Sequence, residues 1–101
     1  TRVGDAVPGW PADWVAELPC RASSAGVYPL PNRPLPIMAD ALVRVVKAYE
    51  LLTAEAAATG SRDAALQALA LHPLGPGADR APALFDDMLR THAAHLEYLT
   101  D

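Results

Sequence analysis

Residues 46–74 read VKAYELLTAEAAATGSRDAALQALALHPL, and this stretch decides the fold of the 101-residue chain. Apolar residues recur in it, and just before it, at spacings of four and three, the period of one helix face. Gly60 suits the residue after a helix, because glycine enters the left-handed conformation cheaply. Ser61 then suits the N-cap of a second helix, which His72 and Pro73 end. The apolar face of the first helix comprises Met38, Leu42, Val45, Tyr49, Leu52 and Ala56.

A third helix is predicted on the carboxyl side of this stretch. Gly75-Pro76-Gly77 forms a turn, Asp79 suits an N-cap, and Pro82 is tolerated in the first helical turn. We therefore expect helices near residues 36–59, 62–72 and 79–99. The apolar seam of the third helix would comprise Phe85, Leu89, His92, Leu96 and Leu99.

Residues 1–36 hold seven of the ten prolines, a density that excludes helix. Residues 14–18 (WVAEL) and 26–28 (GVY) have the composition of short strands, with residues 21–25 as the turn between them. The predicted fold class is α+β, mainly α. We interpret residues 1–101 as a single segment, Pro-rich with short strands over 1–36 and helical over 37–101.

Glu50 and Thr53 lie on the apolar side of the first predicted helix. At about 100° per residue, Asp40, Arg44 and Lys47 share the opposite face, which is expected to face water. Glu50 falls within a second apolar flank and Thr53 lies between that flank and the main seam. The apolar arc is wider than two short helices cover, so we expect Glu50 and Thr53 to contact another domain or subunit. The second flank comprises Ala39, Val43, Val46 and Ala57.

Composition and charge exclude several classes of protein. The net charge of −4 and the scattered basic residues argue against nucleic-acid binding. No apolar run is long enough to span a bilayer, and the amino end does not read as a signal peptide. The single cysteine cannot form an internal disulfide, which is typical of a reducing cytoplasm.

No complete active site is visible in the sequence. Cys20 is interpreted as a small buried apolar residue, and Asp86 with Asp87 as a solvated face. His92 and His95 lie three apart, yet no third ligand stands at metal spacing, so one is expected to pack and the other to face solvent. The chain has no glycine-rich phosphate loop. We therefore predict no catalytic, cofactor-binding or metal-binding residue in this chain.

The stretch resembles the carboxy-terminal region of glycoside hydrolase family 4, most of all its 6-phospho-β-glucosidases. That pattern runs VKAYE-x-LTVEAA-x-TGD and then ALxALxxHPLVP. VGDAVPGWPADWVAELPC is similar to the family's N-x-G-x-I-x-x-LP stretch with its following strand, GVYPLPNRPLP to G-x-x-PLP, and HLEYL to HREYL. The chain departs from the pattern at Ala54, at residues 61–63 and at Gly75, which are packing or capping positions.

The resemblance implies that this chain is the carboxy-terminal part of a larger Rossmann-containing, lactate/malate dehydrogenase-like enzyme. Such enzymes cleave phosphorylated disaccharides by transient oxidation at C3, proton abstraction at C2 and elimination, using NAD and Mn²⁺. The resemblance places neither cofactor on this segment and gives Cys20 no metal role. It implies that this chain packs against an amino-terminal dinucleotide-binding domain, which is missing from this sequence. It also implies that the enzyme is a homo-oligomer.

Two alternatives remain beside the 6-phospho-β-glucosidase interpretation. Within the family, the parent is an α-glucosidase, α-galactosidase or galacturonidase. Outside it, the chain is a free-standing helical module that binds other proteins. An upstream dinucleotide-binding loop would exclude the second alternative.

Overall fold

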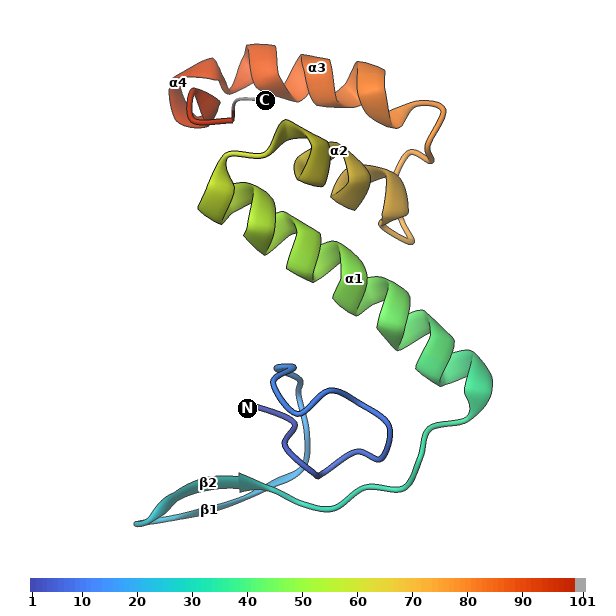
Figure 1. Ribbon diagram of the computed structural model, residues 1–101, viewed down its shortest axis with the longest axis vertical. Coiled ribbons are helices and arrows are strands. Elements are labelled where there is room, and N and C mark those ends of the chain that lie inside the picture. Colours follow the sequence, from blue (N-terminus) through green and yellow to red (C-terminus); the bar gives the residue numbers. More distant parts are fainter. Residues whose placement is uncertain (100–101) are drawn as a thin grey trace. The chain divides into compact units, whose positions relative to one another are not determined.

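The structure, a computed structural model, describes residues 1–99. The chain divides into two compact units, one comprising Thr1–Pro36 and the other beginning at Ile37. The first holds two strands and the second holds four helices, as Figure 1 shows. The predicted fold class, α+β and mainly helical, is confirmed.

Irregular backbone dominates the first unit, which its own hydrogen bonds hold together. The Val3 amide donates to the Trp14 carbonyl at 2.7 Å, and Gly4 donates to Ala12 at 2.9 Å. Val3 is completely buried. The rings of Trp10 and Trp14 lie 5.8 Å apart. Prolines remove donors that a regular ladder would need, so this loop relies on isolated bonds.

The strands form one antiparallel hairpin. Strand β1 (Cys20–Ser23) pairs with β2 (Gly26–Pro29), from Cys20 opposite Pro29 to Ser23 opposite Gly26. Two residues connect them, and the Tyr28 hydroxyl donates to the Ala25 carbonyl at 2.8 Å. Gly26 has φ +133°, a conformation that residues with a Cβ rarely adopt.

The prediction of the second strand was right and that of the first was wrong. In residues 14–18 only Val15 pairs, in an isolated bridge with Arg2. The partner strand instead covers most of the expected turn, residues 20–23. Composition favoured WVAEL over CRAS, but the tight two-residue turn fixes which residues face β2.

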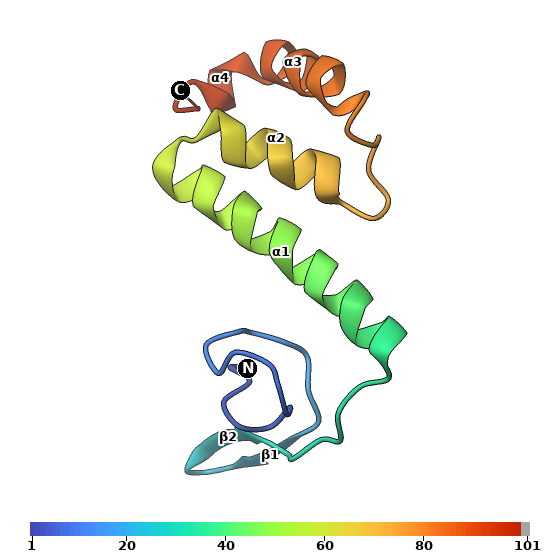
Figure 2. The ribbon, with the colours of Figure 1, turned by 45° about the vertical axis from the view of Figure 1, so that its right-hand side comes forward.

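The helices of the second unit are α1 (Ile37–Thr59), α2 (Arg62–Leu71), α3 (Ala81–Thr91) and α4 (Ala93–Leu96). Both views of the ribbon show α2 lying between α1 and α3 (Figures 1 and 2). The first two helices match the expected ranges to within one residue.

Small side chains form the contact between α1 and α2. Ala56 of α1 and Ala64 and Ala68 of α2 are each no more than 5% exposed. Gly60 turns the chain between the two helices with φ +78°, and the Ser61 hydroxyl accepts the Ala64 amide at 3.1 Å. The predicted glycine turn and serine cap are thus both confirmed. Alanines let the two backbones approach closely, so this hairpin is the packed centre of the unit.

Only the carboxyl half of α1 is covered along the expected seam. Ala56 is buried, whereas Met38 is 80% and Leu42 55% exposed. Helix α1 has 23 residues and α2 has only 10, so α2 is too short to cover the whole face. The expectation that α1 presents more apolar surface than its companions cover is consistent with this.

The third predicted helix was wrong as one continuous element. Helix α3 ends at Thr91, His92 leaves helical geometry with ψ +25°, and α4 follows as a single turn. The predicted Asp79 cap is also absent, since Arg80 precedes α3 and makes no side-chain cap bond. Beyond the break, Leu99 is buried. Of the predicted seam, Phe85 is buried and His92 is exposed.

The cap of α2 gives a direct test of the α1–α2 turn. Replacing Ser61 by Ala removes the acceptor of the Ala64 amide and should lower the free energy of unfolding by about 1 kcal/mol. Ser61→Asp keeps an acceptor and should retain most of the stability. Urea denaturation followed by circular dichroism measures both. Equal stability of Ser61→Ala and the wild type would show that the cap contributes nothing.

Candidate functional site

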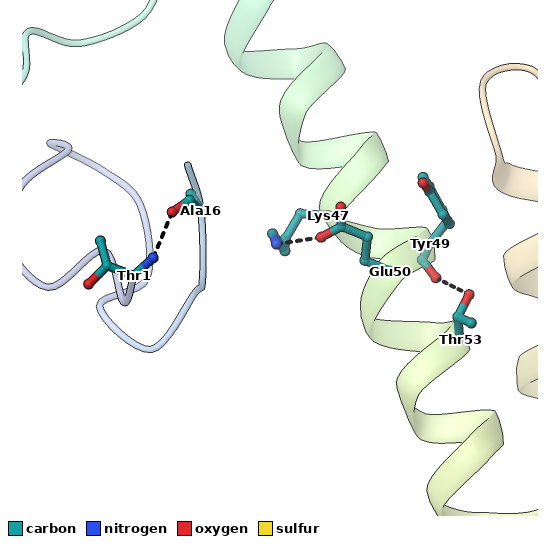
Figure 3. A network of polar contacts seen from close by, with 6 residues as sticks. All are labelled: Thr1, Ala16, Lys47, Tyr49, Glu50 and Thr53. Atoms are coloured by element: carbon teal, nitrogen blue, oxygen red, sulfur yellow. Dashed lines mark hydrogen bonds and ion pairs between the residues drawn. The ribbon is translucent and has the colours of Figure 1, made fainter. Parts of the chain in front are cut away.

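Glu50, which the sequence placed in a buried flank, lies at the surface of this chain. Its side chain is 45% exposed and its carboxylate pairs with Lys47, one turn earlier on α1 (Figure 3). Lys47 was expected to face water, yet only 13% of its side chain is exposed. The helical wheel therefore gave the wrong environment for Lys47, whereas the exposure of Glu50 in this chain does not test its predicted contact with another domain or subunit. Asp40 and Arg44 pair with each other at 2.7 Å on the polar face.

Thr53 has its hydrogen-bond donor satisfied within α1. Its hydroxyl donates to the Tyr49 carbonyl at 2.7 Å (Figure 3). This bond back along the helix is the common one for threonine within a helix. The Thr53 hydroxyl therefore needs no acceptor from another domain for its proton. Its side chain nevertheless lines a hollow in the second unit.

This hollow, called here the helical groove, has a volume of about 310 Å³. Its lining comes from α1, α2, α3, α4 and the residues just after α4. Small side chains line the part formed by α1 and α2, and larger ones line the part formed by α3 and the following segment. The small ones are Ala56, Ala57, Ala65 and Ala68, and the larger ones include Phe85, Met88, Leu96 and Tyr98.

Tyr49 and His72 meet at one wall of the groove. Their ring centroids are 4.3 Å apart at an interplanar angle of 51°. His72 Nδ1 accepts the Leu74 amide at 3.0 Å. The imidazole thus braces the turn after α2 against α1. In the sequence His72 was interpreted only as part of a helix end.

The groove was not predicted from the sequence. The alanines that recur in two consecutive helices are the sequence feature that indicates it, because small side chains leave space that large ones would fill. This feature does not indicate how deep the groove is. The depth depends on the turn at His92, which brings Leu96, Tyr98 and Leu99 to the wall.

The other candidate residues lie apart from the groove or face solvent. Cys20 is exposed in β1, so its interpretation as a buried residue was wrong. His92 and His95 are both exposed, which corrects the expectation that one of them packs. Asp86 and Asp87 are exposed as predicted, and Asp87 pairs with Arg90 at 3.1 Å.

Within residues 1–99, no three His, Cys, Asp or Glu side chains come together to hold a metal ion. Within the same residues, no helix has the length and apolar character that crossing a membrane requires. What the described chain does offer is an apolar groove and an exposed apolar half of α1.

Comparison with known proteins agrees with the order of elements described above. Residues 2–75 match the family profile of the family 4 glycosyl hydrolase C-terminal domain. The chain belongs to glycosyl hydrolase family 4. The match spans the hairpin, α1, α2 and the following turn, and so includes every motif of the resemblance except HLEYL at residues 95–99.

Relatives of this family 4 chain include phospho-glucosidases of both anomeric types. A probable 6-phospho-beta-glucosidase of Bacillus subtilis is 35% identical over 90% of this chain and 21% of its own length. A 6-phospho-beta-glucosidase from Thermotoga maritima, solved with manganese, NAD⁺ and glucose-6-phosphate, has a TM-score of 0.83 at 35% identity over 94% of this chain and 24% of its own. A 6-phospho-alpha-glucosidase from gut microorganisms, solved with NAD and glucose-6-phosphate, has a TM-score of 0.85 at 26% identity over 94% and 22%.

The chain therefore spans between a fifth and a quarter of the length of these relatives. In a longer protein, surfaces that are exposed here have other residues against them. This bears on Glu50, whose position on α1 was predicted to meet another domain or subunit. That contact remains a prediction.

Replacing Glu50 by Ala tests the predicted contact of Glu50 with another domain or subunit. In the 101-residue chain the change should be near neutral, because a pair three residues apart on a helix contributes no more than about 0.5 kcal/mol and alanine favours helix. In a longer protein that contains this chain, the same change should cost roughly 1 to 3 kcal/mol, since a partner donor would be left unpaired. Thermal and urea unfolding of both proteins measure the difference.

Glu55→Ala on the same helix is the matched control, because Glu55 is also exposed. It should be near neutral in both proteins. A large and equal loss from Glu50→Ala in chain and enzyme would show that the pair with Lys47 is its whole role.

Proposed function

We propose that this chain is the carboxy-terminal structural part of an NAD- and Mn²⁺-dependent, 6-phospho-β-glucosidase-like enzyme. The observation that carries the proposal is the match of residues 2–75 to the C-terminal domain of family 4. The relatives at 35% identity from Bacillus subtilis and Thermotoga maritima are named as 6-phospho-beta-glucosidases, which supports the β assignment. The whole enzyme would hydrolyse phosphorylated disaccharides.

A 6-phospho-α-glucosidase is the second candidate. The TM-scores of 0.83 and 0.85 for the β and α enzymes show that this fold serves both. Sequence identity does not separate the two types, because a phospho-alpha-glucosidase from Clostridium acetobutylicum is also 35% identical, over 82% of this chain. Neither the fold nor the identity of this region therefore determines the anomer, and the β assignment rests on the names of the two relatives above.

We expect neither cofactor to bind to this chain. The described residues bring no metal-ligand cluster together, and the sequence has no glycine-rich loop for a pyrophosphate. Both cofactors would bind to the preceding part of the enzyme, where NAD supplies redox chemistry. This chain takes no chemical step in that scheme and acts by packing.

The packing role rests on the exposed half of α1. Ile37, Met38 and Leu42 are 85%, 80% and 55% exposed. Burial of apolar surface of this kind stabilises a protein by about 25 cal/mol per Å². In our proposal it is covered by the dinucleotide-binding part or by a second subunit of a cytoplasmic homo-oligomer. Light scattering of the longer enzyme measures the subunit number.

An assay of the longer enzyme tests the function. With NAD and Mn²⁺ it should release glucose 6-phosphate from a 6-phosphorylated β-disaccharide faster than from the α-anomer. In D₂O the product should carry deuterium at C2, because the proposed route removes that proton. Removing Mn²⁺ with a chelator should abolish turnover, and adding it back should restore it.

Two results would contradict the proposal. Hydrolysis without deuterium at C2 would indicate direct displacement in place of elimination. Faster cleavage of the α-anomer would favour the second candidate. Calorimetry of the 101-residue chain with NAD supplies the control, and we expect no saturable binding there.

A further inference from the structure

The helical groove is open to solvent and has a volume of about 310 Å³. Four alanines and several large apolar side chains line it, and water against such walls is unfavourable. Side chains from another segment would fill it favourably.

Most of the lining of the groove is apolar, and this indicates the chemistry of the occupant. Alanines, leucines, Phe85 and Met88 make up the larger part of it. The side chains with polar atoms are those of Tyr49, Thr53, His72 and Tyr98. Of these, the Thr53 hydroxyl donates to the Tyr49 carbonyl and His72 Nδ1 accepts the Leu74 amide, both within this chain. An occupant with mainly apolar side chains fits this lining.

The size of the groove indicates where that occupant comes from. At 310 Å³ it lies at the lower end of the range for ligand pockets, about 300 to 1,000 Å³, and takes only a few side chains. Two free molecules need about 800 Å² on each partner to form a stable complex, far more than these few side chains supply. A segment of the same polypeptide needs no such area, because its effective concentration is already high.

We propose that the helical groove receives apolar side chains from the polypeptide that precedes this chain in the longer enzyme. The relatives are long enough to contain such a segment, since this chain spans only 21–24% of their length. The inference rests on the proposed function only in requiring that a longer polypeptide exists. It adds that the groove is a docking surface distinct from the exposed amino-terminal half of α1.

Filling the groove from within this chain tests the proposal. Ala57 lines the groove and is exposed, so Ala57→Leu places three further carbons there. In the 101-residue chain the melting temperature should stay unchanged or rise, because the leucine finds apolar walls. In the longer enzyme it should fall by about 2 °C or more, because leucine competes with the docked side chains. Ala58→Leu, exposed and outside the groove, is the matched control.

A labelling experiment gives a second measurement that does not depend on stability. Ala57→Cys, made together with Cys20→Ser, introduces a thiol in the groove. Its reaction with a maleimide, localised by mass spectrometry, should be roughly tenfold or more slower in the longer enzyme than in the 101-residue chain. Protection at residue 57 would thus report docking even if Ala57→Leu failed to fold.

Three outcomes would overturn the proposal. Equal labelling rates in chain and enzyme would show an open groove. A melting temperature of the 101-residue chain that rises with its concentration, and no longer rises in Ala57→Leu, would assign the groove to a second copy. Equal shifts from Ala57→Leu in both proteins would show that no segment competes for it. Any of these leaves the glycosidase assay unchanged, so failure here is distinguishable from failure of the proposed function.

Discussion

The close contact of α1 with α2 is the constraint on which the rest of the helical unit depends. Ala56, Ala64 and Ala68 are buried where the two helices meet, and Gly60 with Ser61 turns the chain at their junction. Because alanine adds little bulk, the backbones approach closely and the contact places α2 against the carboxyl half of α1. Larger residues at these positions would separate the helices and move α3, which packs on α2.

The same alanines explain why the unit leaves so much apolar surface uncovered. Small side chains bury little area each, so this core contributes less stabilisation than one of leucine and isoleucine. Space is left between the helices, and the segment after α4 covers only part of it. Met38 and Leu42 lie beyond the reach of α2 and stay exposed. These features suit a segment whose stability comes largely from contacts with the rest of a longer protein.

The described residues offer packing surfaces and no candidate catalytic site, which is compatible with an enzymatic parent. Two ion pairs form within α1, Asp40 with Arg44 and Lys47 with Glu50. The described residues hold no metal-ligand cluster. The proposed function therefore rests on the family match, and the residues of this chain explain how such a region packs. Solved phospho-glucosidases of both anomeric types share the fold of this region.

The sequence by itself determined the elements whose signals are local. The 3.6-residue period, Gly60, Ser61 and Pro73 fixed α1 and α2 to within a residue, because caps and breakers act on the backbone next to them. Tertiary structure decided what depends on distant neighbours. The tight turn placed β1 at residues 20–23, and burial of Leu99 accompanied the break of the third helix at His92. A helical wheel gives a direction for Glu50 but no environment, since only the packing of the other elements determines which faces water reaches.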